Sequence, residues 1–597
     1  MSAGGPPGRD ALLARAEAWA RDDPDPAAAA ELLALVARAR QGAEAAEANL
    51  RDAFAGGLEF GTAGLRGVIG PGPNRMNRAV VRQATAGLAR YLLRAAPGTR
   101  ERGVVVGRDA RRMSDAFAED VAGVLAAHGI PALVFPEPVP TPLGAFAVLE
   151  QGAAAGVVVT ASHNPPEYNG YKVYWGNGAQ IIPHHEQGIA AEIAAVGPAR
   201  EVPLLSGEEA RRRGLRRELG EEVGRAYLDA IARERRFAGP AGGLSIVTTA
   251  LHGVGAKWLG RALAQAGFTN VHEVAEQREP DGRFPTVRFP NPEEPGAMDL
   301  AFALAEQTGA DLVFANDPDA DRLAVAARDP AGSLRSFGGD AVGVLLGHYL
   351  LTRARPAPER PLLVATVVSS AQLGVIAGEL GARYEETLTG FKWIANRALD
   401  VEAAEGATFV LGYEEALGYA AGTAVRDKDG IGAALVFADL AAWCRSRGLT
   451  AWGYLEEIQR RHGLFLPGQR SFAFPGAQGL ATIRRIMDGF REDPPSGLDG
   501  LDVLETRDYL LRRSRSAAGE MPLSLPASNV IAYLLAGGSR VTLRPSGTEP
   551  KIKYYFEVRE EPGAGEPIAA AAARGRARLD GLAEAFLVLA RERGQPA

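Results

Sequence analysis

A serine at position 162 lies among residue types that could make it a nucleophile. It follows the apolar run Gly156–Val159, with His163 beside it, two prolines in the same turn and Lys172 further along. A hydroxyl needs a nearby base or cation to react, and a stiff loop would hold it in place. A turn whose Ser, His and Asn side chains only satisfy backbone groups has the same pattern. This segment alone leaves both interpretations open.

Three aspartates at alternate positions follow a second apolar run. Asp317, Asp319 and Asp321 come soon after Leu312–Ala315. Three carboxylates so close would repel one another unless a cation lay between them, and oxygen ligands suit Mg²⁺. A calcium loop of the EF-hand type would continue with glycine and a distal glutamate, whereas Arg322 follows here. We therefore expect a metal site rather than a solvated acidic turn.

A third segment combines acids with a later cation. The run Ala407–Leu411 leads to Glu414 and Glu415, and Lys428 follows. Carboxylates accept hydrogen bonds from sugar hydroxyls, and a cation holds phosphate. The start of a helix, where acids interact favourably with the helix dipole, fits this segment equally well.

A fourth segment is rich in hydrogen-bond donors. The expected strand that ends at Leu543 is followed by Arg544, Ser546, Gly547 and Thr548, with two lysines soon after. A tight turn with exposed N–H groups, hydroxyls and cations is suited to a phosphate dianion. A plain hairpin turn would not need so many donors, so we expect a phosphate site.

Size and composition limit the class of protein. The 597 residues are too many for one hydrophobic core and predict about three to five domains. The net charge of −6 gives no electrostatic reason to expect nucleic acid or a membrane surface as partner. Cys444 is the single cysteine, which excludes an internal disulfide and a thiolate metal cage. We see no secretory signal and no apolar run of membrane-spanning length, so we expect a cytoplasmic protein.

One strand–helix–strand pattern occurs three times. Its copies begin near Gly103, Leu244 and Leu362, each with a glycine turn before the second strand. Alternating strands and helices predict mixed, mostly parallel sheets covered on both faces. Repetition along the chain predicts three related α/β domains in tandem.

The C-terminal segment has a different pattern. Val530–Leu535, Ser539–Leu543 and Lys551–Val558 are typical of strands joined by tight turns, and a long helix is expected over 568–593. This predicts a smaller α+β domain. Proline and glycine between residues 466 and 500 predict a linker.

The expected fold is therefore α/β: three tandem related domains with mixed sheets, plus the smaller C-terminal domain, around a central cleft. The expected parts are a helical arm at 1–56, domain I with the serine loop at 57–238, domain II with the metal loop at 239–345, domain III with the sugar loop at 346–480, and domain IV with the phosphate loop at 500–597.

Taken in this order, the four segments resemble the motifs of the α-D-phosphohexomutase superfamily, which includes phosphoglucomutases and phosphomannomutases. The resemblance extends from about residue 58 to residue 557. Five further stretches are similar to its phosphoglucomutase-2/phosphopentomutase branch: Glu59–Gly67, Asn74–Asn77, Gly170–Trp175, Leu251–Gly255 and Pro290–Glu294.

The resemblance implies a magnesium-dependent isomerase that moves a phosphoryl group between two hydroxyls of a sugar phosphate. Ser162 matches the serine that carries the phosphoryl group, and its oxygen with Asp317, Asp319 and Asp321 matches the magnesium ligands. A sugar bisphosphate would be the intermediate, and a sugar 1,6-bisphosphate the activator. The partner would be a small sugar phosphate, and the protein a monomer or dimer.

The other roles transfer by position. Arg66 and Arg322 match arginines near the reacting phosphate, while His163 and Lys172 match groups that move protons or stabilise charge. The residues that match substrate-binding positions are Thr389, Gly390, Lys392, Glu414, Glu415, Lys428, Arg544, Ser546, Gly547 and Thr548.

One departure from the pattern concerns the sugar. Many hexose mutases have serine two places after the glutamate that binds sugar hydroxyls, and this chain has Ala416. We expect interconversion of glucose 1-phosphate and glucose 6-phosphate, with phosphopentomutase or phosphomannomutase activity as the alternative. More remote alternatives are a haloacid-dehalogenase-type phosphatase or mutase with Asp317 as nucleophile, and a non-catalytic sugar-phosphate sensor.

Overall fold

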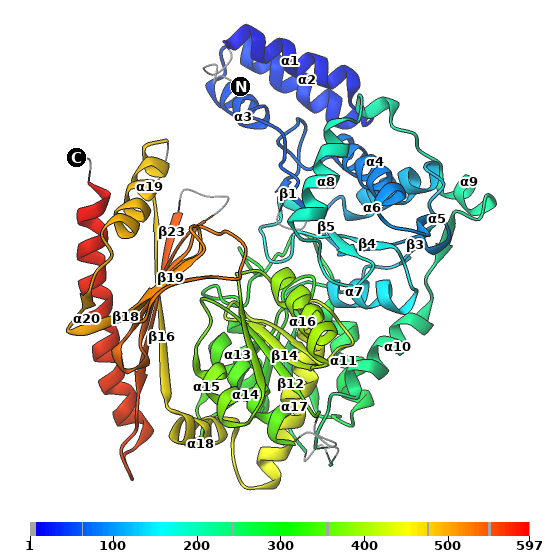
Figure 1. Ribbon diagram of the computed structural model, residues 1–597. Coiled ribbons are helices and arrows are strands. Elements are labelled where there is room, and N and C mark those ends of the chain that lie inside the picture. Colours follow the sequence, from blue (N-terminus) through cyan, green and yellow to red (C-terminus); the bar gives the residue numbers. More distant parts are fainter. Residues whose placement is uncertain are drawn as a thin grey trace. The chain divides into compact units, whose positions relative to one another are not determined.

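A computed structural model gives the fold, and it describes residues 8–61, 64–237, 239–240, 243–353, 358–474, 477–546 and 551–595. The chain divides into two compact units: a first unit of Met1–Phe337 with Leu417–Arg447, and a second unit of Gly338–Ala416 with Gly448–Ala597. The chain therefore leaves the first unit, builds part of the second and returns before completing it (Figure 1).

The first unit begins with three helices, where the sequence predicted one helical arm. These are α1 (Arg9–Asp22), α2 (Pro26–Arg40) and α3 (Glu44–Ala53). They enclose a small core of their own, made mainly of leucine and alanine side chains. Asp25 begins α2 by accepting a hydrogen bond from the Ala27 N–H, and proline at the first helical position suits that turn.

A six-stranded sheet follows, in the order β1-β5-β4-β2-β3-β6. Its strands are β1 (Gly64–Val68), β2 (Val104–Arg108), β3 (Ala132–Val134), β4 (Ala155–Val159), β5 (Tyr168–Trp175) and β6 (Arg216–Glu218). The helices of this domain are α4 (Arg78–Ala95), α5 (Thr99–Arg102), α6 (Ser114–Ala127), α7 (Thr141–Glu150), α8 (Pro183–Ala194), α9 (Gly207–Arg212) and α10 (Glu221–Ala232), with a 3₁₀ turn at Ala199–Glu201. The central strands β2 and β4 are parallel, and their valines are fully buried because helices cover both faces.

A second, five-stranded sheet has the order β11-β10-β9-β7-β8. Its strands are β7 (Ile246–Thr249), β8 (Val271–Glu273), β9 (Leu312–Ala315), β10 (Ala324–Arg328) and β11 (Leu334–Ser336). The other elements of the first unit are α11 (Gly255–Gln265), α12 (Ala275–Arg278), α13 (Asp299–Thr308), β15 (Gly418–Ala421) and α17 (Gly430–Ser446).

The second unit contains a third sheet, in which β12 lies between β13 and β14 and is parallel to both. Its elements are β12 (Pro361–Thr366), β13 (Arg383–Thr387), β14 (Thr408–Glu414), α14 (Gly339–Arg353), α15 (Gln372–Glu379), α16 (Phe391–Glu405) and α18 (Ala451–His462). Three α/β sheets in sequence confirm the predicted tandem arrangement.

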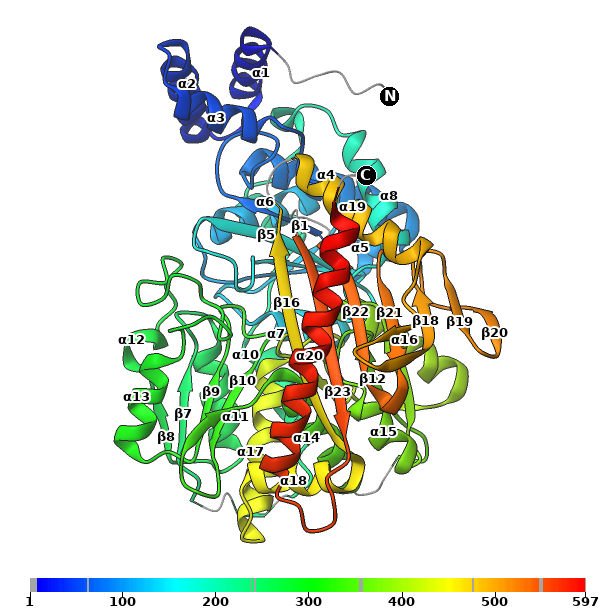
Figure 2. The same cartoon turned by 90° about the vertical axis from the view of Figure 1, so that its left-hand side faces the viewer.

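The C-terminal part of the second unit is an eight-stranded sheet whose paired strands are antiparallel, in the order β16-β23-β22-β21-β18-β19-β20 with β17 beside β18. The strands are β16 (Leu464–Ala473), β17 (Gly497–Leu498), β18 (Leu501–Asp508), β19 (Arg513–Ser516), β20 (Gly519–Pro522), β21 (Ile531–Leu535), β22 (Arg540–Pro545) and β23 (Lys551–Glu560). A 3₁₀ turn spans Ala536–Gly538, and the helices are α19 (Ala477–Glu492) and α20 (Ile568–Gly594). Figure 2 shows the long helix α20 lying across one face of this sheet, against β16 and β23.

The predicted linker between residues 466 and 500 is wrong. That stretch contains β16, which pairs with β23 along ten residues, and α19, which packs against α20. Pro467 and Gly468 lie inside β16. They are tolerated because β16 is an edge strand of the sheet, where a missing backbone donor costs little.

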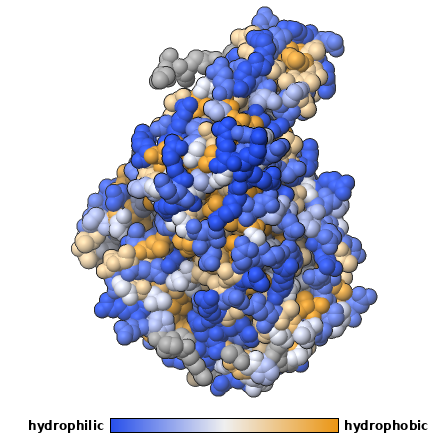
Figure 3. Space-filling view, turned by 90° about the vertical axis from the view of Figure 1, so that its right-hand side faces the viewer, coloured by the Kyte–Doolittle hydropathy of each residue, from blue (hydrophilic) through white to orange (hydrophobic). Residues whose placement is uncertain are grey.

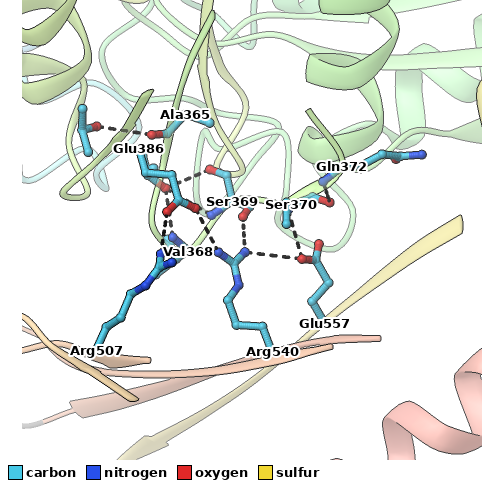
Figure 4. A network of polar contacts seen from close by, with 12 residues as sticks. Ala365, Val368, Ser369, Ser370, Gln372, Glu386, Arg507, Arg540 and Glu557 are labelled. Carbon is cyan, nitrogen blue, oxygen red and sulfur yellow. Dashed lines mark hydrogen bonds and ion pairs between the residues drawn. The ribbon is translucent and has the colours of Figure 1, made fainter. Parts of the chain in front are cut away.

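Ion pairs connect the two parts of the second unit (Figure 4). Glu386 on β13 pairs with Arg507 on β18 at 3.0 Å and with Arg540 on β22 at 3.4 Å. Arg540 also donates to the Ser369 carbonyl, and it lies 3.4 Å from the Glu557 carboxylate. The arginines extend from the C-terminal sheet toward acceptors of the third sheet and its loops. Opposite charges thus alternate across this partly exposed junction.

One face of the molecule can be described by its hydropathy. On the face seen in Figure 3, hydrophilic residues cover most of the surface and hydrophobic ones are scattered, apart from a group at the top of the view. Among the described residues, none of the helices combines the length and the apolar character needed to cross a bilayer.

Candidate active site

Ser162 lies in the first unit, in the loop between β4 and β5. Its side chain is buried, and its Oγ donates a hydrogen bond to Asp317 Oδ2 at 2.8 Å. His163 Nδ1 lies 3.2 Å from the same Oγ. The backbone of Ser162 is left-handed (φ 51°), a conformation that costs roughly 1–2 kcal/mol for a residue with a side chain. The surrounding structure must therefore hold the serine in this position.

The three aspartates occupy the loop after β9, and all three are buried. One carboxylate oxygen from each lies within 4.8 Å of the others. Lys172 on β5 bridges two of them, with its Nζ 2.7 Å from Asp319 Oδ2 and 2.8 Å from Asp321 Oδ2. The strand-to-loop motifs of two different sheets thus meet at one place.

The charged groups of this cluster have pKa values shifted in different directions. Burial, followed by the charges of Asp319 and Asp321, raises the pKa of Asp317 well above its ordinary value. Burial also acts to raise the pKa of Asp319, but Lys172 outweighs it and the pKa is lowered. For Lys172, burial alone would lower the pKa, whereas the two carboxylates raise it overall. The lysine therefore stays protonated near neutral pH.

The cluster fits a divalent metal ion. Within the described part of the chain, Asp319 Oδ1 and Asp321 Oδ1 are buried and have no hydrogen-bond partner. Buried carboxylate oxygens without partners are costly, and a hard cation would satisfy them. A cation would also favour ionised Asp317 and remove the reason for its raised pKa.

His163 and two arginines lie around the serine loop. Burial and the nearby Arg322 and Arg66 lower the pKa of His163 well below its ordinary value, so the imidazole is neutral at pH 7. Arg66 on β1 is exposed and donates to Asn164 Oδ1 at 3.1 Å. Arg322 follows the acid loop directly, and its backbone N–H donates to Asp317 Oδ1.

Lys428 belongs to the same cluster, with its Nζ 3.4 Å from Asp321 Oδ2. The preceding Asp427 holds this segment in place by accepting hydrogen bonds from Tyr174 Oη at 2.6 Å and from Gln180 Nε2 at 2.7 Å. The motif 426–430 is therefore fixed beside the acids by the first sheet, although it is far from them in the sequence.

The other predicted residues lie in the second unit. Gly390 (φ 110°) precedes α16, and Lys392 lies in its first turn, largely buried. Glu414 ends β14. Glu415 accepts hydrogen bonds from Ser369 Oγ at 3.1 Å and Thr366 Oγ1 at 3.4 Å, so its carboxylate already has partners in the protein.

The predicted phosphate loop is described in part. Arg544 lies near the end of β22, and the Ser546 N–H donates to the Lys551 carbonyl at 2.7 Å. Gly547 and Thr548 lie outside the described residues. Thr389 lies in the short loop between β13 and α16, next to Gly390.

Sequence reasoning missed two residues that contact the cluster. Thr141, at the start of α7, donates from Oγ1 to Asp319 Oδ2 at 2.7 Å. Arg111, in the turn after β2, donates to the Ser162 carbonyl. Both residues lie in the connections that follow strands of the first sheet, Arg111 after β2 and Thr141 at the end of the longer loop after β3, and that position was the signal that could have found them.

Comparison with protein families agrees with this architecture. Models described as phosphoglucomutase/phosphomannomutase α/β/α domain I, domain II, domain III and C-terminal domain match residues 57–199, 225–332, 338–459 and 505–574. The chain therefore belongs to the phosphoglucomutase/phosphomannomutase family. It is a phosphohexomutase-type enzyme, an isomerase that acts as an intramolecular phosphotransferase.

Individual relatives span nearly the whole chain. A "Probable phosphomannomutase" of Haemophilus influenzae is 40% identical, covering 81% of this chain and 93% of its own length. The phosphopentomutase of Homo sapiens is 36% identical, covering 94% of each chain. The structure of parafusin (phosphoglucomutase) from Paramecium, in its open form, shares the fold, with a TM-score of 0.64 and 17% identity over 90% of this chain and 95% of that one. The predicted family, fold class and enzyme class are confirmed.

Proposed function

We propose that this enzyme interconverts the 1-phosphate and 6-phosphate of a hexose, with glucose as the preferred sugar, through a phosphorylated Ser162. The 2.8 Å hydrogen bond from Ser162 Oγ to Asp317 carries this proposal, because it sets a hydroxyl beside three buried acids suited to a metal. The division into an arm and four domains, at the boundaries given above, is part of the proposal.

In the first half-reaction, the bond from phosphorus to the Ser162 oxygen breaks and a bond from phosphorus to a sugar hydroxyl forms. The hydroxyl proton leaves for a nearby base, and the result is a sugar bisphosphate. The raised pKa of Lys172 supports a charge-stabilising role, whereas His163 is proposed as the proton acceptor because it is neutral and lies beside Ser162 Oγ. Protonated Lys172 stabilises the oxygen that gains charge, and neutral His163 is able to accept a proton.

In the second half-reaction, the other phosphate of the bisphosphate returns to Ser162, which regenerates the phosphoenzyme and releases the isomer. Arg66 and Arg322 are proposed to neutralise the transferring phosphoryl oxygens. Arg544, with Ser546, Gly547 and Thr548, is proposed to bind the phosphate that does not react. The remaining substrate contacts are proposed for Thr389, Gly390, Lys392, Glu414, Glu415 and Lys428.

Two small molecules complete the proposal. Mg²⁺ held by Asp317, Asp319, Asp321 and the Ser162 oxygen would supply positive charge at the transferring phosphoryl group. A sugar 1,6-bisphosphate would activate the enzyme by phosphorylating an unmodified Ser162.

A pentose phosphate is the second candidate substrate. The Ala416 position, which lacks the hydroxyl found in many hexose mutases, supports it, as does the extent of similarity to the human phosphopentomutase. A panel of glucose, mannose and pentose 1-phosphates with Mg²⁺ and bisphosphate would decide, by comparison of kcat/KM. A higher value for a pentose would replace glucose as the proposed substrate.

Replacement of the serine tests the mechanism itself. Ser162→Ala should lower turnover by at least about four orders of magnitude, since the group that forms the covalent intermediate is removed. Labelled bisphosphate should leave an acid-stable phosphate on wild-type protein and none on the variant. Ser333→Ala, at an exposed turn, is the matched control and should keep the label and the rate.

Two results would reject the assignment. Wild-type turnover by Ser162→Ala would exclude Ser162 as nucleophile. A label on the wild type that hydroxylamine removes would indicate an acyl phosphate, as the haloacid-dehalogenase alternative with Asp317 requires.

A further inference from the structure

Arg111 holds the serine loop through the backbone. Its side chain is buried, and the guanidinium donates four hydrogen bonds to main-chain carbonyl groups of a single short segment. The acceptors are the carbonyl oxygens of Ser162 and Asn164 at Nη2, and those of Pro165 and Tyr168 at Nη1, at 2.8 Å and 3.2 Å respectively. One planar group thus bonds three carbonyl groups of the loop that links β4 to β5 and the first carbonyl group of β5.

This loop needs an external constraint. The left-handed backbone at Ser162 is disfavoured for a serine, so it persists only where neighbouring groups over-determine it. A guanidinium presents several donors in one rigid plane, whereas an ammonium group has three donors on a flexible stem. The four acceptors therefore require arginine and not merely a positive charge.

Arg111 is itself held from two sides. The Asp109 carboxylate lies 3.3 Å from its Nε, and Asp109 Oδ1 accepts from the Arg111 N–H and from Ser114 Oγ. On another side, the Phe284 ring centre lies 4.9 Å from the guanidinium carbon. Phe284 comes from the second sheet's domain, so the two domains of the first unit meet at this side chain.

The loop that carries Phe284 is closely fitted to the arginine's turn. A side chain at Gly282 would approach within 2.9 Å of backbone atoms of residues 110–112, so only glycine allows this contact. The backbone of Phe284 is also left-handed (φ 49°). The aromatic ring is therefore held over the guanidinium by a tightly fitted loop.

We infer that Arg111 is a positioning residue for the phosphoryl-transfer step. It holds the loop so that Ser162 Oγ stays within hydrogen-bonding distance of Asp317, and the Phe284 ring keeps its guanidinium in place. The inference rests on the proposed function, because it assumes that Ser162 carries the phosphoryl group. Arg111 acts through the loop backbone, because its hydrogen bond to Ser162 goes to the carbonyl oxygen.

Arg111→Lys is the decisive variant, because it keeps the charge and removes the planar set of donors. We expect kcat to fall about 100-fold, the cost of misplacing a reacting group by about 1 Å, while KM for the sugar phosphate stays within about threefold. The rate at which labelled bisphosphate phosphorylates Ser162 should fall by a similar factor. Arg112→Lys, in the same turn with an exposed side chain, is the matched control and should match the wild type.

A second variant keeps the test decisive if Arg111→Lys does not fold. Phe284→Leu retains the arginine and all its acceptors but loses the aromatic face, so kcat should fall about fivefold to tenfold, again without a change in KM. The melting temperature of each variant would establish that it is folded.

Three outcomes would overturn the inference. The first is a folded Arg111→Lys variant whose kcat equals that of the wild type. The second is a Phe284→Leu variant whose kcat equals that of the wild type. The third is a loss of activity in either variant that comes mainly from a higher KM. The proposed function fails separately, if wild-type Ser162 takes up no phosphate at all.

Discussion

Two polar regions of this enzyme, one buried and one partly exposed, differ in how their charges are balanced. Around Ser162, three acids lie together, two of their oxygens have no hydrogen-bond partner among the described residues, and the serine backbone is strained. In the second unit, Glu386 and the arginines at 507 and 540 alternate in sign, in regular strands (Figure 4). Burying the three acids without a further positive charge costs folding free energy. The ion pairs of the second unit already balance their charges within the protein. This difference separates a cluster that a further cation would stabilise from a network that joins two sheets.

After replacement of the serine, the largest effect should come from removing one charge from the acid cluster. Asp319→Asn should lower the Mg²⁺-dependent rate about 100-fold to 1,000-fold and raise the Mg²⁺ concentration needed for activity, since an amide is a poorer ligand than a carboxylate. Magnesium titration of turnover checks both effects. Asp115→Asn, at an exposed helix start, is the control. An unchanged magnesium dependence would mean that the cluster is not the metal site.

The second unit should respond to pH through Asp340. Burial, followed by the charges of Glu557 and Glu415, raises the pKa of Asp340 to about 7. The folded state then binds this proton more tightly than the unfolded chain does, so its contribution to stability is complete below about pH 4 and is lost as the pH rises through 7. Between pH 5.5 and 8, the loss should be about 2 kcal/mol.

Thermal unfolding of the full-length wild type and of Asp340→Asn, at both pH values, measures this loss. The amide cannot ionise, so the variant should show a smaller decrease in melting temperature on going to pH 8. Parallel decreases in the two proteins would show that Asp340 does not titrate in this range.

The smallest effect should come from weakening the ion pairs of Glu386 with Arg507 and Arg540. Glu386→Gln should lower the stability of the second unit by about 1 kcal/mol, because two partly exposed ion pairs are weakened and their hydrogen bonds are partly kept. The melting temperature should fall by about 2–4 °C. Glu520→Gln breaks a fully surface ion pair with Arg515 and should have no measurable effect. A large loss of turnover with unchanged stability would contradict the contrast between the two regions.

The features that could be predicted from the sequence are those that short local patterns determine. Ser162 and the three aspartates each follow a short apolar run, and a run that ends in polar residues is typical of a strand leading into a functional loop. The structure has β4 and β9 at those positions. The three α/β sheets were also predictable, because each strand–helix–strand pattern is contained in a short stretch of chain.

What depends on distant contacts was not predicted. Arg111 lies 51 residues before the serine whose loop it holds, and nothing in its immediate neighbours indicates that partner. The strand β16 was predicted as part of a linker because of its proline and glycine. It forms a strand because its pairing with β23 overrides that local signal. The arm was predicted as helical, but its division into three helices depends on a small core that sequence reasoning did not identify.

The order in which the chain visits its two units has a consequence for biosynthesis. Lys428 and Asp427, which complete the acid cluster, arrive only after the segment Gly338–Ala416 has been made. A nascent chain that ends at residue 337 has its carboxylates but lacks one of their counter-charges. Assembly of the acid cluster during synthesis therefore waits until residues 427 and 428 have been made, and a fragment that ends at residue 337 lacks both of them.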